Sequence, residues 1–253
     1  MAMSSKILVL KNLNLKIPGI TKPILDDINY EVHAGDFVIL LGSNGSGKSS
    51  LLKAIDRRYQ IFTSGEISLA GKKLRNYKAA DFCRRVITIT QNCLESLFPS
   101  LTVLENCVLA RQRFENKIFQ LKVKRNLQNY FKEYLSRYNQ NLSDKLEVKV
   151  ANLSGGEQQA LVLALSILAK PQLLLLDEHT SALDPAAANR LMQITATAVS
   201  ENKITCLLST HDLDIAIKYG NRILALKQGK IRHQVEAAAK ENISPADLLH
   251  DCY

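Results

Sequence analysis

The sequence has 253 residues, which is enough for one large α/β domain or two small ones. Its 46% hydrophobic and 23% charged residues are ordinary for soluble globular proteins, and no apolar stretch approaches the ~18–20 residues of a transmembrane helix. The five cysteines form no C-x-x-C pair, which argues against a disulfide framework or a zinc site, and the N-terminus lacks the layout of a signal peptide. We therefore expect a protein of the reducing cytoplasm.

The net charge of +9 is mostly local. Between residues 111 and 140, eight basic residues stand against two acidic ones. A solvated helical face explains this surplus most simply, whereas lipid headgroups and, less favoured, nucleic acid are the alternative anionic partners.

The N-terminal part is predicted to form antiparallel strands over Ile7–Ile17 and Ile24–Val32, followed by a turn at Ala34–Asp36. The unbroken apolar run Phe37–Leu41 indicates a buried parallel strand. A glycine-rich loop follows directly, and Ser49–Ile55 is predicted to form a helix with one apolar face.

The glycine-rich loop reads G-x-x-x-x-G-K-S and lies between a strand and a helix, the context in which this pattern binds nucleotide phosphates. Its glycines let backbone N–H groups point inward, and the helix N-terminus adds partial positive charge. Lys48 is predicted to reach the β- and γ-phosphates, and Ser49 to ligate Mg²⁺. The alternative, a glycine-rich turn before an ordinary helix, is disfavoured by this context. The predicted nucleotide-binding residues are Gly42, Ser43, Asn44, Gly45, Ser46, Gly47, Lys48, Ser49 and Ser50.

Two strands are predicted next, an edge strand over Glu66–Gly71 and a β-branched strand over Val86–Thr90. From Asn92 to Val150 the pattern changes to helices. Apolar and aromatic residues there recur at helical spacing, which favours a core role for the tyrosines over a binding platform. These residues are Leu127, Tyr130, Phe131, Tyr134, Leu135 and Tyr138.

The α/β character then returns. The sequence predicts a helix over Ser154–Lys170, a buried strand over Leu173–Leu176, a further strand over Ile204–Ser209 and a hairpin over Arg222–Ile231. The tail Val235–Tyr253 is predicted to be helical and peripheral.

Two carboxylates, Asp177 and Glu178, follow the four leucines of the buried strand. Ligands of open α/β sheets bind at this carboxyl edge. Asp177 is suited to hold the Mg²⁺ that Ser49 also contacts, and Glu178 to act as general base toward a water attacking the γ-phosphate. The alternative is a pair of solvated acids that end a strand, which the neighbouring phosphate loop disfavours.

The segment Leu153–Gln159 reads L-S-G-G-E-Q-Q. Ser154 can cap the following helix, and two glycines leave its first N–H groups open to an anion. One triphosphate does not need two such sites in one molecule. We therefore expect a head-to-tail pair of subunits in which each lends this helix end to the other's nucleotide.

In order and spacing, these motifs resemble those of the ATP-binding cassette (ABC) transporter ATPases over essentially the whole chain. Residues 42–49 resemble the Walker A loop, 153–159 the signature motif and 173–177 the Walker B strand. The resemblance implies catalytic roles for Glu178, His211 and the Q-loop glutamine Gln91, and metal binding by Ser49, Gln91 and Asp177. It also implies that four residues of the signature motif contact the partner's nucleotide: Ser154, Gly155, Gly156 and Glu157. A D-loop is implied at Ser181, Ala182, Leu183 and Asp184.

The resemblance implies an α/β fold, a P-loop NTPase with a RecA-like core and an N-terminal antiparallel β-subdomain, over residues 1–91 and 151–253. A helical subdomain over residues 92–150 is inserted. It further implies ATP and Mg²⁺ as cofactors, a head-to-tail homodimer, separate transmembrane permease subunits, and a place in the cytoplasm against the inner face of the cell membrane.

The function implied is hydrolysis of ATP to drive solute transport, and residues 91–110 are closest to importers. The segment Asp177–Thr180 has His179 in place of the usual proline or small residue. In this it resembles the same segment of an importer subgroup whose members work with extracytoplasmic binding proteins for aromatic amino acids or similar solutes. An exporter subunit is the nearest alternative. A non-transport ABC ATPase acting on nucleic acid or ribosomes is disfavoured, because those proteins contain long coiled coils or two cassettes.

The segment that would contact the base departs from the family. ABC ATPases stack adenine on an aromatic ring roughly where residues 17–20 lie, but no aromatic residue stands between Leu13 and Ile28. The sequence leaves an aliphatic wall of Ile17, Pro18 or Ile20, or a more distant ring such as Tyr30, as alternatives.

Overall fold

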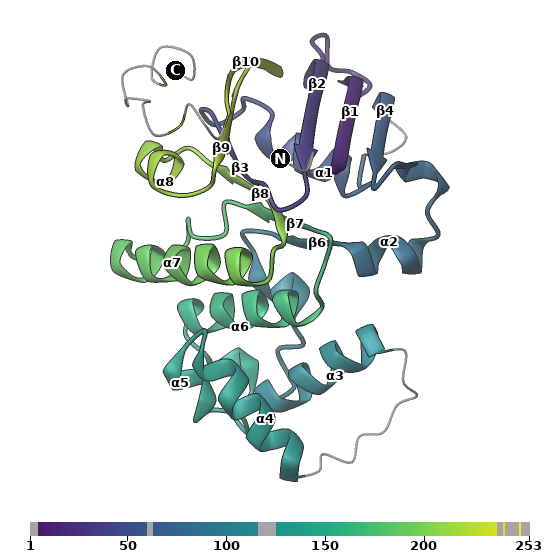
Figure 1. Cartoon of the computed structure of the whole chain (residues 1–253). Helices are drawn as coiled ribbons and strands as arrows, with labels where there is room; N and C mark the ends of the chain where they lie inside the picture. Colours follow the sequence, from purple (N-terminus) through teal and green to yellow (C-terminus); the bar gives the residue numbers. More distant parts are fainter. Residues whose placement is uncertain (1–4, 60–62, 116–124, 237–239, 241–247, 249–253) are drawn as a thin grey trace. The chain divides into compact units, whose positions relative to one another are not determined.

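A computed structural model describes residues 5–59, 63–115, 125–236, 240 and 248 (Figure 1). It divides into two compact units, one of Met1–Thr88, Gln172–Glu178 and Lys203–Tyr253, the other of Ile89–Pro171 and His179–Asn202. The second unit extends beyond the predicted insert at 92–150, because helices formed by later residues pack with those of the insert.

A six-stranded sheet forms the centre of the first unit, in the order β10-β9-β3-β8-β7-β6. Strand β3 runs parallel to β8 and β9, and β7 runs parallel to β8, whereas β9 and β10 form an antiparallel hairpin. All residues of β3 and the leucines of β7 are buried, as expected for parallel strands covered on both faces. The strands are β3 (Phe37–Leu41), β6 (Val86–Ile89), β7 (Leu173–Asp177), β8 (Thr205–Thr210), β9 (Arg222–Lys227) and β10 (Lys230–Val235).

The second sheet of this unit is antiparallel, in the order β2-β1-β4-β5. Its strands are β1 (Lys6–Leu15), β2 (Leu25–His33), β4 (Thr63–Leu69) and β5 (Lys72–Lys73). The prediction that residues 66–71 form the edge strand is wrong. The chain turns at Gly71, and the two-residue strand β5 pairs with β4 and takes the edge.

Strand β1 has an irregularity that its apolar-rich sequence did not predict. Its register with β2 shifts between Leu10 and Leu13, and both Asn12 (φ 46°) and Asp27 (φ 53°) adopt left-handed conformations. The Asn12 side-chain amide donates a hydrogen bond of 3.0 Å to Oδ1 of Asp27. This bulge lets Leu10 and Leu13, three positions apart, both lie in the core.

The helices of the first unit are short: α1 (Lys48–Ile55), α2 (Ala79–Arg85), α8 (Leu213–Lys218) and the 3₁₀ turn η2 (Leu74–Asn76). Helix α1 buries Leu51, Leu52 and Ile55, as its apolar spacing predicts. These side chains join a core with leucines of both sheets, so the glycine-rich loop is supported from both of its ends.

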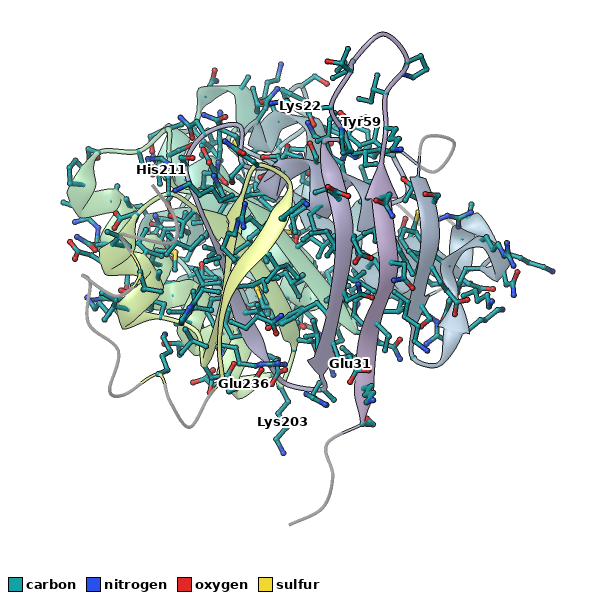
Figure 2. All side chains as sticks on the ribbon, turned by 90° about the horizontal axis from the view of Figure 1, so that it is seen from above. Lys22, Glu31, Tyr59, Lys203, His211 and Glu236 are labelled. Carbon is teal, nitrogen blue, oxygen red and sulfur yellow. The ribbon has the colours of Figure 1, made fainter. Side chains whose placement is uncertain are left out.

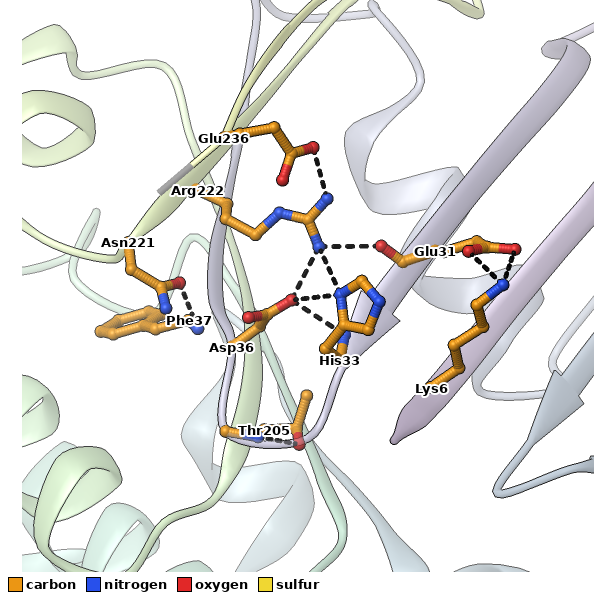
Figure 3. Close-up of polar contacts among 10 residues, drawn as sticks. Lys6, Glu31, His33, Asp36, Phe37, Thr205, Asn221, Arg222 and Glu236 are labelled. Carbon is orange, nitrogen blue, oxygen red and sulfur yellow. Dashed lines mark hydrogen bonds and ion pairs between the residues drawn. The ribbon is translucent and has the colours of Figure 1, made fainter. Parts of the chain in front are cut away.

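A buried arginine ties together the segments at one edge of this unit (Figure 3). The side chain of Arg222 is 6% exposed and donates to Oδ2 of Asp36 at 2.7 Å, to the carbonyl of Glu31 at 2.9 Å and to Oε1 of Glu236 at 2.6 Å. Its guanidinium also lies 5.0 Å from the centre of the Tyr30 ring. A buried charge requires such compensation, and here it joins β2 to the β9–β10 hairpin.

The second unit is helical, as the change of pattern after Asn92 predicts. Its elements are η3 (Cys93–Ser96), α3 (Val103–Glu115), α4 (Arg125–Ser136), α5 (Gln140–Ser143), η4 (Val150–Asn152), α6 (Gly155–Leu168) and α7 (Pro185–Glu201). Phe131 and Leu135 of α4 are fully buried, and the Tyr134 hydroxyl donates to the carbonyl of Ala164 at 2.7 Å. The core role predicted for Tyr130 is wrong, because this residue is 44% exposed.

Most of the C-terminal tail predicted over Val235–Tyr253 lies outside the described residues, which here comprise the end of β10, Glu236, Lys240 and Leu248. Within the described part of the chain, no helix has the length and apolar character needed to cross a membrane.

Candidate nucleotide-binding and catalytic site

The glycine-rich loop follows β3 in the first unit, at the carboxyl end of the strand. A Cβ atom on Gly42 (φ 154°) would lie 2.3 Å from the carbonyl oxygen of Leu226, so only glycine fits there. Gly47 (φ 110°) is the N-cap of α1 and has no side chain to occupy the first N–H groups of the helix. These N–H groups are therefore open to an anion, as phosphate binding requires.

Two side chains of the loop, those of Ser46 and Lys48, have the chemistry to bind a phosphate. The Ser46 hydroxyl is buried and finds no hydrogen-bond partner among the described residues. Lys48 is 4% exposed, and its ammonium donates to the carbonyls of Gly42 at 2.7 Å and Ser43 at 3.1 Å. A buried ammonium held by loop carbonyls and an unsatisfied buried hydroxyl both fit an anionic ligand in this loop.

The first residues of α1 and the last residue of β7 meet beside this loop. Ser49 Oγ donates a hydrogen bond of 2.8 Å to Asp177 Oδ1. Mg²⁺ at phosphate sites keeps several waters and takes few protein oxygens, so a hydroxyl and a carboxylate fit its chemistry. Among the described residues, no group of three or more His, Cys, Asp or Glu side chains is arranged to hold a metal ion by itself, and a site of this kind does not need one.

Glu178 and His211 lie next to each other at this edge. Oε1 of Glu178 is 3.7 Å from Nζ of Lys48 and 3.6 Å from Nδ1 of His211. The imidazole is 53% exposed and precedes α8, which Asp212 caps by accepting from the N–H groups of residues 214 and 215. Figure 2 shows His211 at the edge of the unit opposite to Glu31 and Glu236. A carboxylate placed here can accept a proton from a water in the site.

Ser209, which the sequence analysis did not single out, belongs to the same cluster. Its hydroxyl donates to Asp177 Oδ1 at 2.7 Å and accepts from the backbone N–H of Glu178 at 3.1 Å. The available signal was a serine at the end of an apolar run, two positions before His211.

The signature segment lies in the second unit, where Ser154 caps α6 as predicted. Its hydroxyl accepts from the N–H of Glu157 at 3.4 Å, and Glu157 accepts from the N–H of Ser154 at 3.0 Å. Partial burial acts to raise the pKa of Glu157, but hydrogen bonds from Lys145 and from the N–H and hydroxyl of Ser154 lower it overall. A Cβ on Gly156 would meet nothing within 4 Å, so the start of the helix is open.

Gln91 and the predicted D-loop lie in the second unit as well. Gln91 is exposed, and its backbone carbonyl accepts from Nε2 of Gln159 at 3.3 Å. Residues 181–183 form a turn, and Asp184 caps α7 by accepting from the N–H groups of residues 186 and 187 at 3.0 Å each. The roles of these residues toward a nucleotide stay predictions.

The segment that would contact the base contains no ring. Ile20 is 52% exposed in the loop between β1 and β2. This loop returns to β2 through Ile24, whose carbonyl oxygen would lie 3.2 Å from a Cβ on Gly47, so the loop borders the phosphate site. Tyr30 is 5% exposed and belongs to the core under Arg222, so it does not supply the missing ring.

Comparison with known proteins agrees with this geometry. The family model described as ABC transporter matches residues 25–181. The chain is 36% identical to a tyrosine transport ATP-binding protein of Clostridioides difficile (strain R20291), over 96% of this chain and 97% of that protein. It is 34% identical to the general L-amino acid transport ATP-binding protein AapP of Rhizobium johnstonii (strain DSM 114642 / LMG 32736 / 3841), over 85% of this chain and 80% of that protein.

Two solved structures share the fold. One is cbiO1 of Clostridium perfringens, part of the ABC transporter complex cbiONQ, with a TM-score of 0.77 and 23% identity over 97% of this chain and 91% of that one. The other is the ATP-binding cassette MJ0796 as a dimer bound to ADP and Pi, with a TM-score of 0.72 and 25% identity over 91% of this chain and 99% of that one. The family match and the relatives show that this chain belongs to the ABC transporter family and is an ATPase of that family.

Proposed function

We propose that this chain is the ATP-hydrolysing subunit of an ABC importer for amino acids, acting on separate permease subunits. The observation that supports this most strongly is the convergence of polar side chains at one edge of the first unit. They come from the phosphate loop and from the ends of two parallel strands: Lys48, Ser49, Asp177, Glu178 and His211.

In the proposed reaction the loop binds the phosphates of ATP through its N–H groups, and the Lys48 ammonium stabilises the negative charge that develops on the transferred phosphoryl group. Ser49 and Asp177 would hold Mg²⁺, which supplies charge neutralisation and orients the phosphates when bound. The Glu178 carboxylate accepts a proton from the attacking water, whose oxygen bonds to the γ-phosphorus as the bond to ADP breaks. His211 orients Glu178 from 3.6 Å away.

A head-to-tail homodimer completes the proposed site, with Ser154, Gly155 and Gly156 of the partner subunit contacting the nucleotide. The capping box fixes the first turn of α6, and the two glycines leave it accessible. The solved structure of the cassette MJ0796 is a dimer bound to ADP and Pi, which supports a dimer for this chain.

Phe98 is the residue that we propose for contact with the permease. Its side chain is 57% exposed, although a phenyl ring gains free energy on burial. Asn106, 2% exposed, accepts from the N–H of Phe98 at 2.8 Å and donates to its carbonyl at 3.1 Å. The backbone that presents this ring is therefore fixed, and Leu94, 38% exposed, adds apolar surface in the same segment. An exposed ring on a fixed backbone suits a protein contact.

The solute class rests on the relatives. Both a tyrosine transport protein and a general L-amino acid transport protein match most of the chain, and the sequence around His179 resembles importers for aromatic amino acids. We therefore propose an aromatic amino acid as the solute, an extracytoplasmic binding protein as a further partner, and the inner face of the cell membrane as the location.

The basic segment between residues 111 and 140 gives little support to the nucleic-acid alternative. Of the side chains described there, Lys132 pairs with Asp144 at 3.1 Å and Arg137 with Glu133 at 3.6 Å. The Arg111 guanidinium lies 5.4 Å from the centre of the Tyr130 ring. These contacts fit a solvated helical face.

The proposal is tested by uptake of radiolabelled tyrosine in cells that lack the gene and are complemented with variants. We expect uptake to return with the wild-type chain and not with Glu178→Gln. Phe98→Ala should restore little uptake while its ATPase activity, measured on the isolated protein, stays near that of the wild type. Uptake that is unaffected by loss of the gene, for tyrosine and for a panel of other amino acids, would contradict the proposed solute class.

A further inference from the structure

Ser209 lies where the strands of the central sheet end. It is the fifth residue of β8, is 1% exposed and pairs in register with Asp177 of β7 and Leu40 of β3. A buried hydroxyl group on a strand with neighbours on both sides has no contact with solvent, so its hydrogen-bond partners must come from the protein.

The two hydrogen bonds of this hydroxyl use its proton and a lone pair. The proton goes to Asp177 Oδ1 at 2.7 Å, and the oxygen accepts from the backbone N–H of Glu178 at 3.1 Å. Ser49 donates to the same Oδ1 from the other side at 2.8 Å. Asp177 Oδ1 is thus held between two hydroxyls, one of which also binds the next residue of the chain.

Glu178 has an unusual backbone that this bond supports. Its φ of 47° lies in the left-handed region, which residues with a Cβ rarely adopt and which persists only where surrounding contacts hold it. In this conformation Oε1 of Glu178 lies 3.7 Å from Lys48 Nζ and 3.6 Å from His211 Nδ1. The direction of the carboxylate therefore depends on the turn that Ser209 stabilises.

We propose that Ser209 is a positioning residue for ATP hydrolysis, whose hydroxyl fixes both the Asp177 carboxylate and the left-handed turn at Glu178. This inference rests on the roles proposed above for Asp177 and Glu178. Ser209 itself does not contact the reacting atoms. Removal of its hydroxyl takes away one acceptor of the Glu178 N–H and one donor to Asp177. We expect this loss to affect the chemical step more than nucleotide binding.

The decisive comparison is Ser209→Val against Ser209→Thr, because the two side chains have the same shape and only threonine keeps the hydroxyl. For Ser209→Val we expect kcat to fall by about 10–100-fold, the usual effect of losing a partner that orients a site residue. The KM for ATP should stay within about threefold, and Ser209→Thr should keep most of the wild-type kcat. If neither variant folds because valine and threonine are larger than serine, Ser209→Ala, which adds no atoms, is compared with the wild type.

Thr205→Val is the matched control at the other end of β8. Thr205 is 2% exposed, and its hydroxyl accepts from the N–H of Gly35 at 3.0 Å. This variant loses a buried hydrogen bond of the same strand and should have a lower melting temperature but an unchanged kcat.

Equal losses of kcat in Thr205→Val and Ser209→Val would overturn the inference, as would a wild-type kcat in Ser209→Val or a threonine variant no better than valine. Glu178→Gln, measured alongside, separates the two proposals. If Glu178→Gln turns over normally, the role proposed for Glu178 fails. If it is inactive while Ser209→Val is normal, only the inference about Ser209 fails.

Discussion

The hydroxyl of Ser49 lies 2.8 Å from the carboxylate of Asp177, although the two residues are separated by 128 positions in the sequence. Ser49 stands in the first turn of α1, and Asp177 ends β7. Because β3, β8 and β7 are parallel, their carboxyl ends meet at one edge of the sheet and bring the phosphate loop to the acidic residues. The site within the first unit is thus a consequence of strand order.

Lys48→Ala and Ser154→Arg should fail at different steps. Lys48 is buried within the phosphate loop, so its loss should weaken ATP binding itself. Ser154 caps a helix of the second unit, and arginine there would fill the space proposed for the γ-phosphate of the partner subunit's nucleotide. Ser154→Arg should therefore bind ATP in a monomeric preparation but not hydrolyse it. Isothermal titration of monomers and steady-state turnover measure the two steps.

Loss of the serine cap also reduces stability, typically by about 1 kcal/mol, so Ser154→Ala is the control for that effect. It should be less stable than the wild type and retain more turnover than Ser154→Arg. If Lys48→Ala and Ser154→Arg lose ATP affinity equally as monomers, the shared-site dimer is wrong.

Base recognition should be weak. With Ile20 exposed and Tyr30 in the core, no described ring of the β1–β2 segment is available to stack on adenine. Aromatic stacking contributes ~1–3 kcal/mol per base, so ATP should bind about 5–150-fold more weakly than with a ring present. Side-by-side titration should show little preference for ATP over GTP, and Ile20→Tyr should tighten both.

Ile20→Val, which keeps an aliphatic side chain, is the control and should leave both affinities near those of the wild type. A preference for ATP above about tenfold in the wild type, ~1.4 kcal/mol, would show that hydrogen bonds from other residues select the base.

Stability should fall in mild acid because of His179. Burial lowers the pKa of His179 to about 4, from an ordinary value near 6.5. Below pH 6.5 the unfolded chain therefore binds a proton at His179, whereas the folded chain does not bind it until about pH 4. As the pH falls through this range, the free energy of unfolding decreases by up to ~1.4 kcal/mol per pH unit. Urea unfolding at pH 7 and pH 5 should differ by about 2 kcal/mol from this residue alone.

His179→Leu should reduce that pH dependence. The Thr195 hydroxyl donates to the carbonyl of Leu191 at 2.8 Å, so it accepts from Nε2 of His179 at 3.2 Å and keeps its own acceptor in the variant. An unchanged difference between pH 7 and pH 5 in His179→Leu would show that other groups cause it.

Local patterns were sufficient for much of the fold. The apolar runs of β3 and β7 predicted buried parallel strands, and Ser154 at a helix start predicted the cap, because these features depend on neighbouring residues alone. The bulge at Asn12 was not predictable in the same way. It depends on the side chain of Asp27 on another strand, and an apolar-rich stretch does not reveal that pairing.

The site shows the same limit. The phosphate loop and the acidic pair were identifiable because each is a continuous motif. Ser209 was missed because its partners, Asp177 and Glu178, are more than thirty positions away, at separations of 32 and 31 residues. The periodicity of α4 likewise predicted Tyr130 as core, but position on a helix face did not reveal that its ring would be 44% exposed.

Glu178→Gln shows whether the Glu178 carboxylate is the general base of ATP hydrolysis. The amide keeps the size of the side chain but cannot accept the proton of the attacking water, so ATP should bind while turnover falls by ~10²–10⁴-fold. Unhydrolysed nucleotide should then hold two subunits together. Size-exclusion chromatography with and without ATP, combined with a phosphate-release assay, reads out both effects on one sample, and Glu201→Gln, at the end of α7, is the matched control.

We expect Glu178→Gln to elute as a dimer in ATP and as a monomer without it, with almost no phosphate released, whereas Glu201→Gln should behave as the wild type. Turnover above about a tenth of the wild-type rate in Glu178→Gln would show that Glu178 is not the general base, because loss of a general base costs ~10²–10⁴-fold.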